Sequence, residues 1–112
     1  MNDNKGTSGI PVKVLESAII EQLKLVYDPE IPVNVYDLGL IYDIDINDKG
    51  EVRILMTLTA PNCPVADSLP EEVRTRASAV QGISSVEVEL TFDPPWNVDF
   101  ISEEGKLMLG ML

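Results

Sequence analysis

Apolar residues recur at helical spacing in the first third of the chain. Pro11 suits the start of a helix, because the N–H that proline lacks would have no partner there. Asp28 stands before Pro29, a position that disfavours helical backbone, so we expect the helix to end near Tyr27. The residues expected to face inward lie three and four positions apart; they are Leu15, Ala18, Ile19, Gln22, Leu23 and Val26.

Two later segments alternate between apolar and polar residues, as strands with one buried face do. The turn residues Asn47–Gly50 lie between them, which predicts a β-hairpin. In the first strand the apolar face carries Leu40, Tyr42, Ile44 and Ile46, and the opposite face carries Asp43, Asp45 and Asn47. The second strand has an apolar face of Val52, Ile54, Met56 and Leu58.

Helical spacing returns between Pro64 and Val80, before Gly82. Pro70 interrupts this pattern. Either the helix is kinked there, or a short turn precedes a helix capped by Ser68, with Glu71 completing a capping box. The expected inner stripe is Val65, Leu69, Val73, Ala77 and Val80.

A third alternating segment predicts a strand over residues 86–92, which Asp93-Pro94-Pro95-Trp96 ends. Its apolar face carries Val86, Val88, Leu90 and Phe92. We expect a short extended piece over residues 98–101, and Ser102 can cap a final short helix.

Because each strand has one apolar face, helices are expected to cover the sheet on one side only. The prediction is an α+β fold, a two-layer sandwich with a small three-stranded mixed sheet and helices on one face. Residues 1–9 are expected to form a disordered tail, and residues 10–112 a single domain.

Composition narrows the classes of partner and chemistry. Acidic residues outnumber basic ones by 19 to 8, giving a net charge of −11, which repels phosphate backbones and anionic lipids. We therefore expect no nucleic acid and no membrane as partners. The chain has no histidine, which excludes Ser-His-Asp and Cys-His catalysis and metal sites that need imidazole. One cysteine cannot form an intramolecular disulfide, which fits a reducing, cytoplasmic setting.

That cysteine, Cys63, lies where a predicted strand gives way to a helix. A helix N-terminus carries partial positive charge and favours a thiolate, although a lone cysteine is also commonly a small buried apolar residue. The predicted strand directions bring its loop to the same sheet edge as two others. These loops contain Asp28 and Glu30, and Asp93 to Trp96. Asp28 can equally serve only to end the helix, and Trp96 is favoured as a core residue.

Four segments of the chain form a set of motifs: Asp28-Pro29-Glu30, Asp37-Leu38-Gly39-Leu40-Ile41-Tyr42, Thr59-Ala60-Pro61-Asn62-Cys63-Pro64 and Asp93-Pro94-Pro95-Trp96. In this order and spacing they resemble the iron–sulfur cluster assembly domain proteins of the SufT and phenylacetate-oxygenase maturation (PaaD-like) group. The resemblance covers roughly residues 11 to 110. Longer PaaD-like members carry a cysteine-rich C-terminal extension that is lacking here, and eukaryotic cytosolic members have histidine where Asn62 stands. The chain thus resembles a bacterial stand-alone SufT-like member.

The resemblance implies an accessory factor of the SUF system, not an enzyme, that assists cluster maturation or transfer to client apoproteins through Cys63. Its implied partners are iron–sulfur assembly scaffold proteins and client apoproteins, and a homodimer is a further expectation. A cluster usually takes four thiolates, so the expected cofactor is a transient iron–sulfur cluster and none is held tightly by a single chain. The implied supporting site comprises Asp28, Glu30, Thr59, Asn62, Asp93 and Trp96.

Two other functions stay open. One is a thiol-dependent enzyme with Cys63 as nucleophile and Glu30 or Asp28 as base, although carboxylates are poor bases for a thiol and raise its pKa. The other is a protein-binding adaptor without cluster chemistry.

Overall fold

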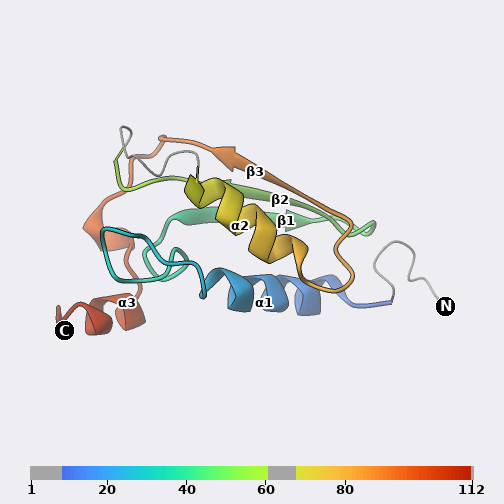
Figure 1. The fold of residues 1–112 in the computed structure, drawn as a ribbon, viewed down its shortest axis with the longest axis horizontal. Coiled ribbons are helices and arrows are strands. Elements are labelled where there is room, and N and C mark those ends of the chain that lie inside the picture. Colours follow the sequence, from blue (N-terminus) through green and yellow to red (C-terminus); the bar gives the residue numbers. More distant parts are fainter. Residues whose placement is uncertain (1–8, 61–67, 112) are drawn as a thin grey trace.

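The computed structural model of the protein describes residues 9–60 and 68–111. Within these residues the chain forms an α+β fold, as its apolar patterns predict (Figure 1). In chain order the elements are α1 (Val12–Leu23), β1 (Ile41–Ile46), β2 (Glu51–Met56), α2 (Ser68–Ser78), β3 (Ser85–Leu90), the 3₁₀ helix η1 (Val98–Phe100) and α3 (Glu103–Met108).

The sheet is mixed and has the strand order β1-β2-β3. β1 and β2 form the predicted antiparallel hairpin, and β3 lies parallel to β2. Helices α1 and α2 lie along the same face of this sheet (Figure 1). The prediction of a small three-stranded mixed sheet with helices on one face is therefore confirmed.

The core fills the space between the sheet and these helices. Val52, Ile54 and Met56 alternate along β2 and are buried on the helix side. The helices contribute residues spaced three and four apart, which also have almost no exposed surface; they are Leu15, Ile19 and Leu23 from α1, and Leu69, Val73 and Ala77 from α2.

Strand β1 departs from strict alternation at Tyr42. Ile41 pairs with Met56, whereas the next paired residue, Asp43, lies opposite Leu55, so Tyr42 is the extra residue of a β-bulge. Because directly opposed residues share a face, Ile41 joins Ile44 against the core. The prediction that Tyr42 faces inward is wrong, since a bulge shifts every position before it by one.

Helix α1 ends at Leu23, not near Tyr27. The chain leaves the helix through a tight turn in which the Leu25 N–H donates to the Gln22 carbonyl oxygen. Tyr27 then pairs with Asn34 as an isolated antiparallel bridge, which requires extended backbone. The proline after Asp28 is thus one constraint among several, and the bridge ends the helix earlier.

The C-terminal part of the chain also corrects two predictions. Strand β3 ends at Leu90, and Leu90 and Phe92 are exposed, so only Val86 and Val88 of its apolar face pack on the core. The segment expected to be extended forms η1, because the Asn97 side chain accepts the N–H of Asp99 and caps a 3₁₀ turn. Ser102 caps α3 as predicted, accepting the Gly105 N–H at 3.0 Å.

Helix α2 is described from Ser68, with Pro70 in its first three described residues. Glu71 does not form the side-chain bonds of the capping box there; its carboxylate receives the Arg74 guanidinium instead. The part of the predicted helix between Pro64 and Asp67 lies outside the described residues.

Over residues 9–60 and 68–111, the helices are too short and too polar to cross a membrane.

Candidate functional site

The loops that carry the predicted site residues meet at one end of the sheet. The connection from α1 to β1, the chain after β2, the chain after β3 and helix α3 all lie at that end (Figure 1). The strand ends are tied together there, since the Thr57 N–H donates to Leu40 O at 2.8 Å and the Thr91 N–H donates to Met56 O at 2.9 Å. We call this region the loop end and the opposite region, around the Asn47–Gly50 turn, the hairpin end.

Asp28 organises the first of these loops. Its side chain is buried, and Oδ1 accepts the N–H groups of Glu30 at 2.8 Å and of Ile31 at 3.0 Å. This is a side chain that mimics a backbone turn. Glu30 itself is exposed, so the turn holds its backbone while the carboxylate faces solvent.

A second buried carboxylate, Asp37, links the loop to the C-terminal segment. Its Oδ2 accepts from Asn34 Nδ2 at 2.9 Å, and its Oδ1 accepts from Ser102 Oγ at 2.8 Å. The backbone repeats both links, because the Asp37 N–H donates to Asn34 Oδ1 and the Ser102 N–H donates to the Asp37 carbonyl oxygen, each at 2.8 Å. The side chain that caps α3 is therefore also bonded to the α1–β1 loop.

Two glycines allow the C-terminal segment to lie directly against this loop. Gly39 has φ +81°, and a Cβ built on it would lie 2.3 Å from the carbonyl oxygen of Phe100. On Gly105, a Cβ would lie 2.8 Å from an Ile101 methyl carbon and 3.0 Å from the Asp37 carbonyl oxygen. Larger residues at either position would force the two segments apart.

Trp96 completes the junction from the chain that follows β3. Its ring is half-buried against the core, and Nε1 donates to the Leu38 carbonyl oxygen at 2.6 Å. The core role favoured for Trp96 thus agrees with its packing, and its hydrogen bond also fixes the Asp37–Gly39 turn.

Thr59 and Asp93 follow the parallel strands β2 and β3 at the loop end. Thr59 is half-buried, whereas Asp93 is exposed and donates its N–H to Thr91 Oγ1 at 3.2 Å. Beside them the Tyr42 hydroxyl donates to the Pro94 carbonyl oxygen at 2.7 Å. Burial raises the pKa of the Tyr42 phenol above its ordinary value, and a side-chain hydrogen bond with Thr57 lowers it in part.

Asn62 and Cys63 lie outside the described residues, so their distances to the other predicted site residues are not part of this geometry. Within residues 9–60 and 68–111, no three ligating side chains lie close enough together to hold a metal ion. The described part of the loop end therefore supplies a rigid frame and exposed carboxylates, with no preformed metal cage among its residues.

The link from Asp37 to Ser102 is the feature that the residue patterns miss. Asp37-Leu38-Gly39 indicates a turn into β1, but all three residues also hold the C-terminal segment. The local half of the arrangement has a sequence signal, because Asn34 and Asp37 are polar residues three apart within a mainly apolar stretch. The distant half, Ser102, has no signal that points to Asp37.

A family model described as "Iron-sulfur cluster assembly protein" matches residues 16–90. Over 97 residues the chain is 56% identical to a Fe-S protein maturation auxiliary factor of Porphyromonas gingivalis, covering 87% of this chain and 92% of that protein. It is also 33% identical over 87 residues to the Fe-S protein maturation auxiliary factor SufT of Staphylococcus aureus, covering 78% of this chain and 99% of that one.

Among solved structures, the chain is similar to a domain of unknown function from Bacillus anthracis. The TM-score is 0.82 at 31% sequence identity, and the match covers 89% of this chain and 95% of that domain.

Proposed function

This chain belongs to the iron–sulfur cluster assembly protein family, and we propose that it is an accessory factor that assists the maturation of client iron–sulfur proteins through Cys63. The cluster is its cargo, and the protein acts without catalytic turnover of its own. The names of the relatives as maturation auxiliary factors support the role. The assignment to Cys63 rests on the motif Thr59 to Pro64.

One observation carries this proposal into the structure. The segment that contains Cys63 leaves the fold after Leu58 and re-enters it before Leu69, and each of these residues is only 2% exposed. Both ends of the segment are thus anchored in the core at the loop end, where the turns around Asp28 and Asp37 are hydrogen-bonded. Function commonly resides on loops that a rigid scaffold positions in this way.

The donor chemistry limits what one chain can do. A cluster usually takes four thiolates, and this chain supplies one. In the proposed mechanism the Cys63 thiolate provides one iron ligand for a cluster in transit, and the client, a scaffold protein or a second copy provides the others. Glu30 and Asp93 are exposed carboxylates at the same end, which can take part in docking or in transient contact with iron.

The direct test is Cys63→Ser in cells that lack the wild-type protein. Serine is un-ionised at neutral pH and binds iron far less well than a thiolate, so aconitase-type activity should fall to the level of cells without the protein. Melting temperature is measured beside it and should change little, because an exposed Cys→Ser substitution leaves no cavity. Full activity of the variant would contradict the proposal, and a large drop in melting temperature would make Cys63 a packing residue.

Anaerobic reconstitution separates carriage of a cluster from thiol catalysis. Purified wild-type protein should retain less than one cluster per chain by iron and sulfide analysis, and Cys63→Ser should retain none. Glu30→Gln is a milder comparison, because it keeps the shape of the side chain and removes its charge. Cluster-free wild type combined with full support of client enzymes would instead favour a protein-binding adaptor.

A further inference from the structure

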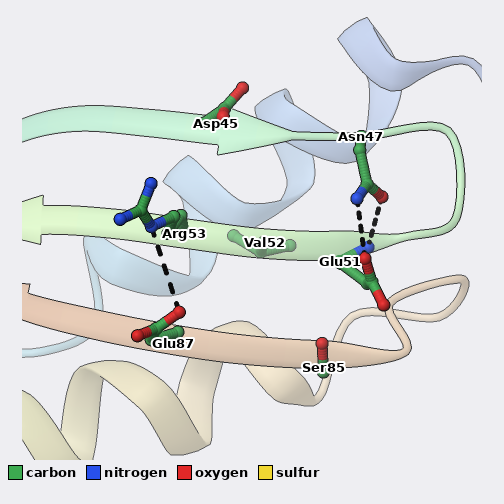
Figure 2. Close-up of a pocket in the computed structure, with 7 residues that line it drawn as sticks. All are labelled: Asp45, Asn47, Glu51, Val52, Arg53, Ser85 and Glu87. Atoms are coloured by element: carbon green, nitrogen blue, oxygen red, sulfur yellow. Dashed lines mark hydrogen bonds and ion pairs between the residues drawn. The ribbon is translucent and has the colours of Figure 1, made fainter.

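The face of the sheet that points away from the helices carries mostly charged side chains. In Figure 2 Asp45, Arg53 and Glu87 form a row across β1, β2 and β3, with the helices behind the sheet. The next row toward the loop end is Asp43, Leu55 and Glu89. We call this surface the open face; its acidic residues Asp43, Asp45, Glu51, Glu87 and Glu89 are accompanied by a single guanidinium, from Arg53.

Arg53 neutralises mainly the β3 side of the open face. Its Nη2 lies 3.4 Å from Glu89 Oε1, and its Nε lies 3.9 Å from Glu87 Oε1. In the described part of the chain, no basic side chain pairs with Asp43 or Asp45. The β1 side of this face is therefore the more negative, in a protein whose net charge is already −11.

Toward the loop end the open face becomes apolar. A shallow groove of about 560 Å³ lies there, lined by Tyr42, Leu55, Pro94 and Phe100 together with Gly39 and Asp93. The rings of Tyr42 and Phe100 meet edge to face, with centroids 6.0 Å apart and an interplanar angle of 78°. The Tyr42 hydroxyl bonds to the Pro94 carbonyl oxygen, so the walls of the groove are held in place before anything binds.

The bulge in β1 creates this groove. With regular alternation Tyr42 would face the core, but the extra residue places it beside Leu55 on the open face. An aromatic ring, an aliphatic side chain and a second aromatic ring then adjoin the unpaired carboxylates of the same strand. Preformed apolar pockets beside charged residues are typical of surfaces that anchor a partner by one or two side chains.

We propose that the open face docks a cationic segment of a partner protein, with one apolar side chain in the groove and lysine or arginine side chains over Asp43 and Asp45. Charge complementarity selects this occupant, because a nucleic acid or a second copy of this acidic chain would be repelled. Same-face residues of a strand are about 7 Å apart, so the first cation should follow the apolar anchor by two to four residues in an extended segment. The inference needs no chemistry at Cys63.

The test uses the full chain labelled with ¹⁵N and a synthetic peptide in which one phenylalanine is followed, at alternate positions, by two arginines. Amide shifts should concentrate at Asp43, Asp45, Leu55 and Phe100. Replacing the phenylalanine by alanine, or Leu55→Thr in the protein, should weaken binding about tenfold, as expected for loss of a buried apolar side chain.

A matched pair of charge variants tests the electrostatic part. Asp43→Asn with Asp45→Asn should weaken binding by about three- to tenfold and reduce its dependence on salt. Glu21→Gln with Glu72→Gln removes the same charge from exposed positions on the helices and should leave binding nearly unchanged.

Three outcomes would overturn the proposal. The first is equal weakening by both charge pairs, which would indicate attraction by net charge alone. The second is the absence of shifts at millimolar peptide, or shifts confined to α1 and α2. The third is a dimer, detected by sedimentation equilibrium, that Leu55→Thr dissociates, because the face would then be an interface between copies of this chain. Thermal melts of each variant establish that it folds.

Discussion

The two ends of the sheet are held together in different ways. At the hairpin end, exposed Asn47 accepts the N–H groups of Lys49 at 2.9 Å and Glu51 at 3.0 Å, bonds that span only two and four residues. At the loop end, buried Asp37 bonds to Asn34 and, across 65 residues of sequence, to Ser102. The hairpin end is thus stabilised locally in contact with water, and the loop end by buried contacts between distant segments.

This difference determines what a lost group costs. An exposed donor or acceptor that loses its partner can bond to water, whereas a buried one cannot. The loop end is irregular in backbone and carries the predicted site residues, yet its stability depends on a few pairings. We therefore expect substitutions at the loop end to destabilise the protein more than equivalent substitutions elsewhere.

The largest contrast should come from two glycines with left-handed backbone. Gly39→Ala should lower the free energy of unfolding by about 3–5 kcal/mol, because its Cβ would collide with the Phe100 backbone. Gly110 has φ +74° but nothing within 4 Å of its Cβ position, so Gly110→Ala should cost only the conformational penalty of about 1–2 kcal/mol. Urea denaturation measures both, and equal losses would show that the close approach to Phe100 has no energetic weight.

The next contrast concerns the polar residue that organises each end. Asp37→Ala should cost about 2–4 kcal/mol, since it leaves both the Asn34 amide and the Ser102 hydroxyl without their partner. Asn47→Ala should cost about 0.5–1 kcal/mol, because water replaces the lost acceptor. Urea midpoints of the two variants provide the comparison, and a larger loss for Asn47→Ala would reverse the proposed roles of the two ends.

A smaller effect is expected where packing can be kept while one bond is removed. Trp96→Phe retains an aromatic ring but loses the Nε1 bond to the Leu38 carbonyl oxygen, which should cost about 1 kcal/mol in addition to any loss of packing. Thermal unfolding followed by far-ultraviolet circular dichroism measures the change. A variant as stable as the wild type would mean that this bond contributes nothing net.

The smallest effect should appear only at alkaline pH. Burial raises the pKa of Tyr42, so folding favours its neutral form; this contribution is complete below the ordinary phenol pKa and is lost as pH rises through the folded-state pKa. Absorbance at the phenolate band should show Tyr42→Phe removing the high-pH part of the titration. Loss of the low-pH part instead would contradict the assignment of the raised pKa to Tyr42.

The same contrast explains what the sequence could predict. The hairpin follows from local signals, because Asn47–Gly50 forms the turn and the flanking residues alternate. The order of elements and the convergence of the loops at one end follow from similar patterns. The bulge at Tyr42 could not be predicted, since a residue that breaks register in the structure still fits the alternation in the sequence.

The candidate site divides in the same way. Asp28 and Asp37 are identifiable as polar residues in loops, but their partners are not, because burial of a carboxylate depends on which distant segment covers it. Glu30, Thr59, Asp93 and Trp96 were expected at one sheet edge from strand directions alone, and the loops that carry them lie there. Cys63 and Asn62 remain predictions from the motif.

The bond between Asp37 and Ser102 also bears on the order in which the protein is completed during synthesis. The α1–β1 loop is among the first segments to leave the ribosome, but residues 96–105, which supply its indole donor, its capping serine and its close-packed glycine, are among the last. Domains form their long-range contacts only when the contributing segments are available. A nascent chain can therefore pair β1 with β2 early, while the end that bears the motif residues acquires its final form only as translation finishes.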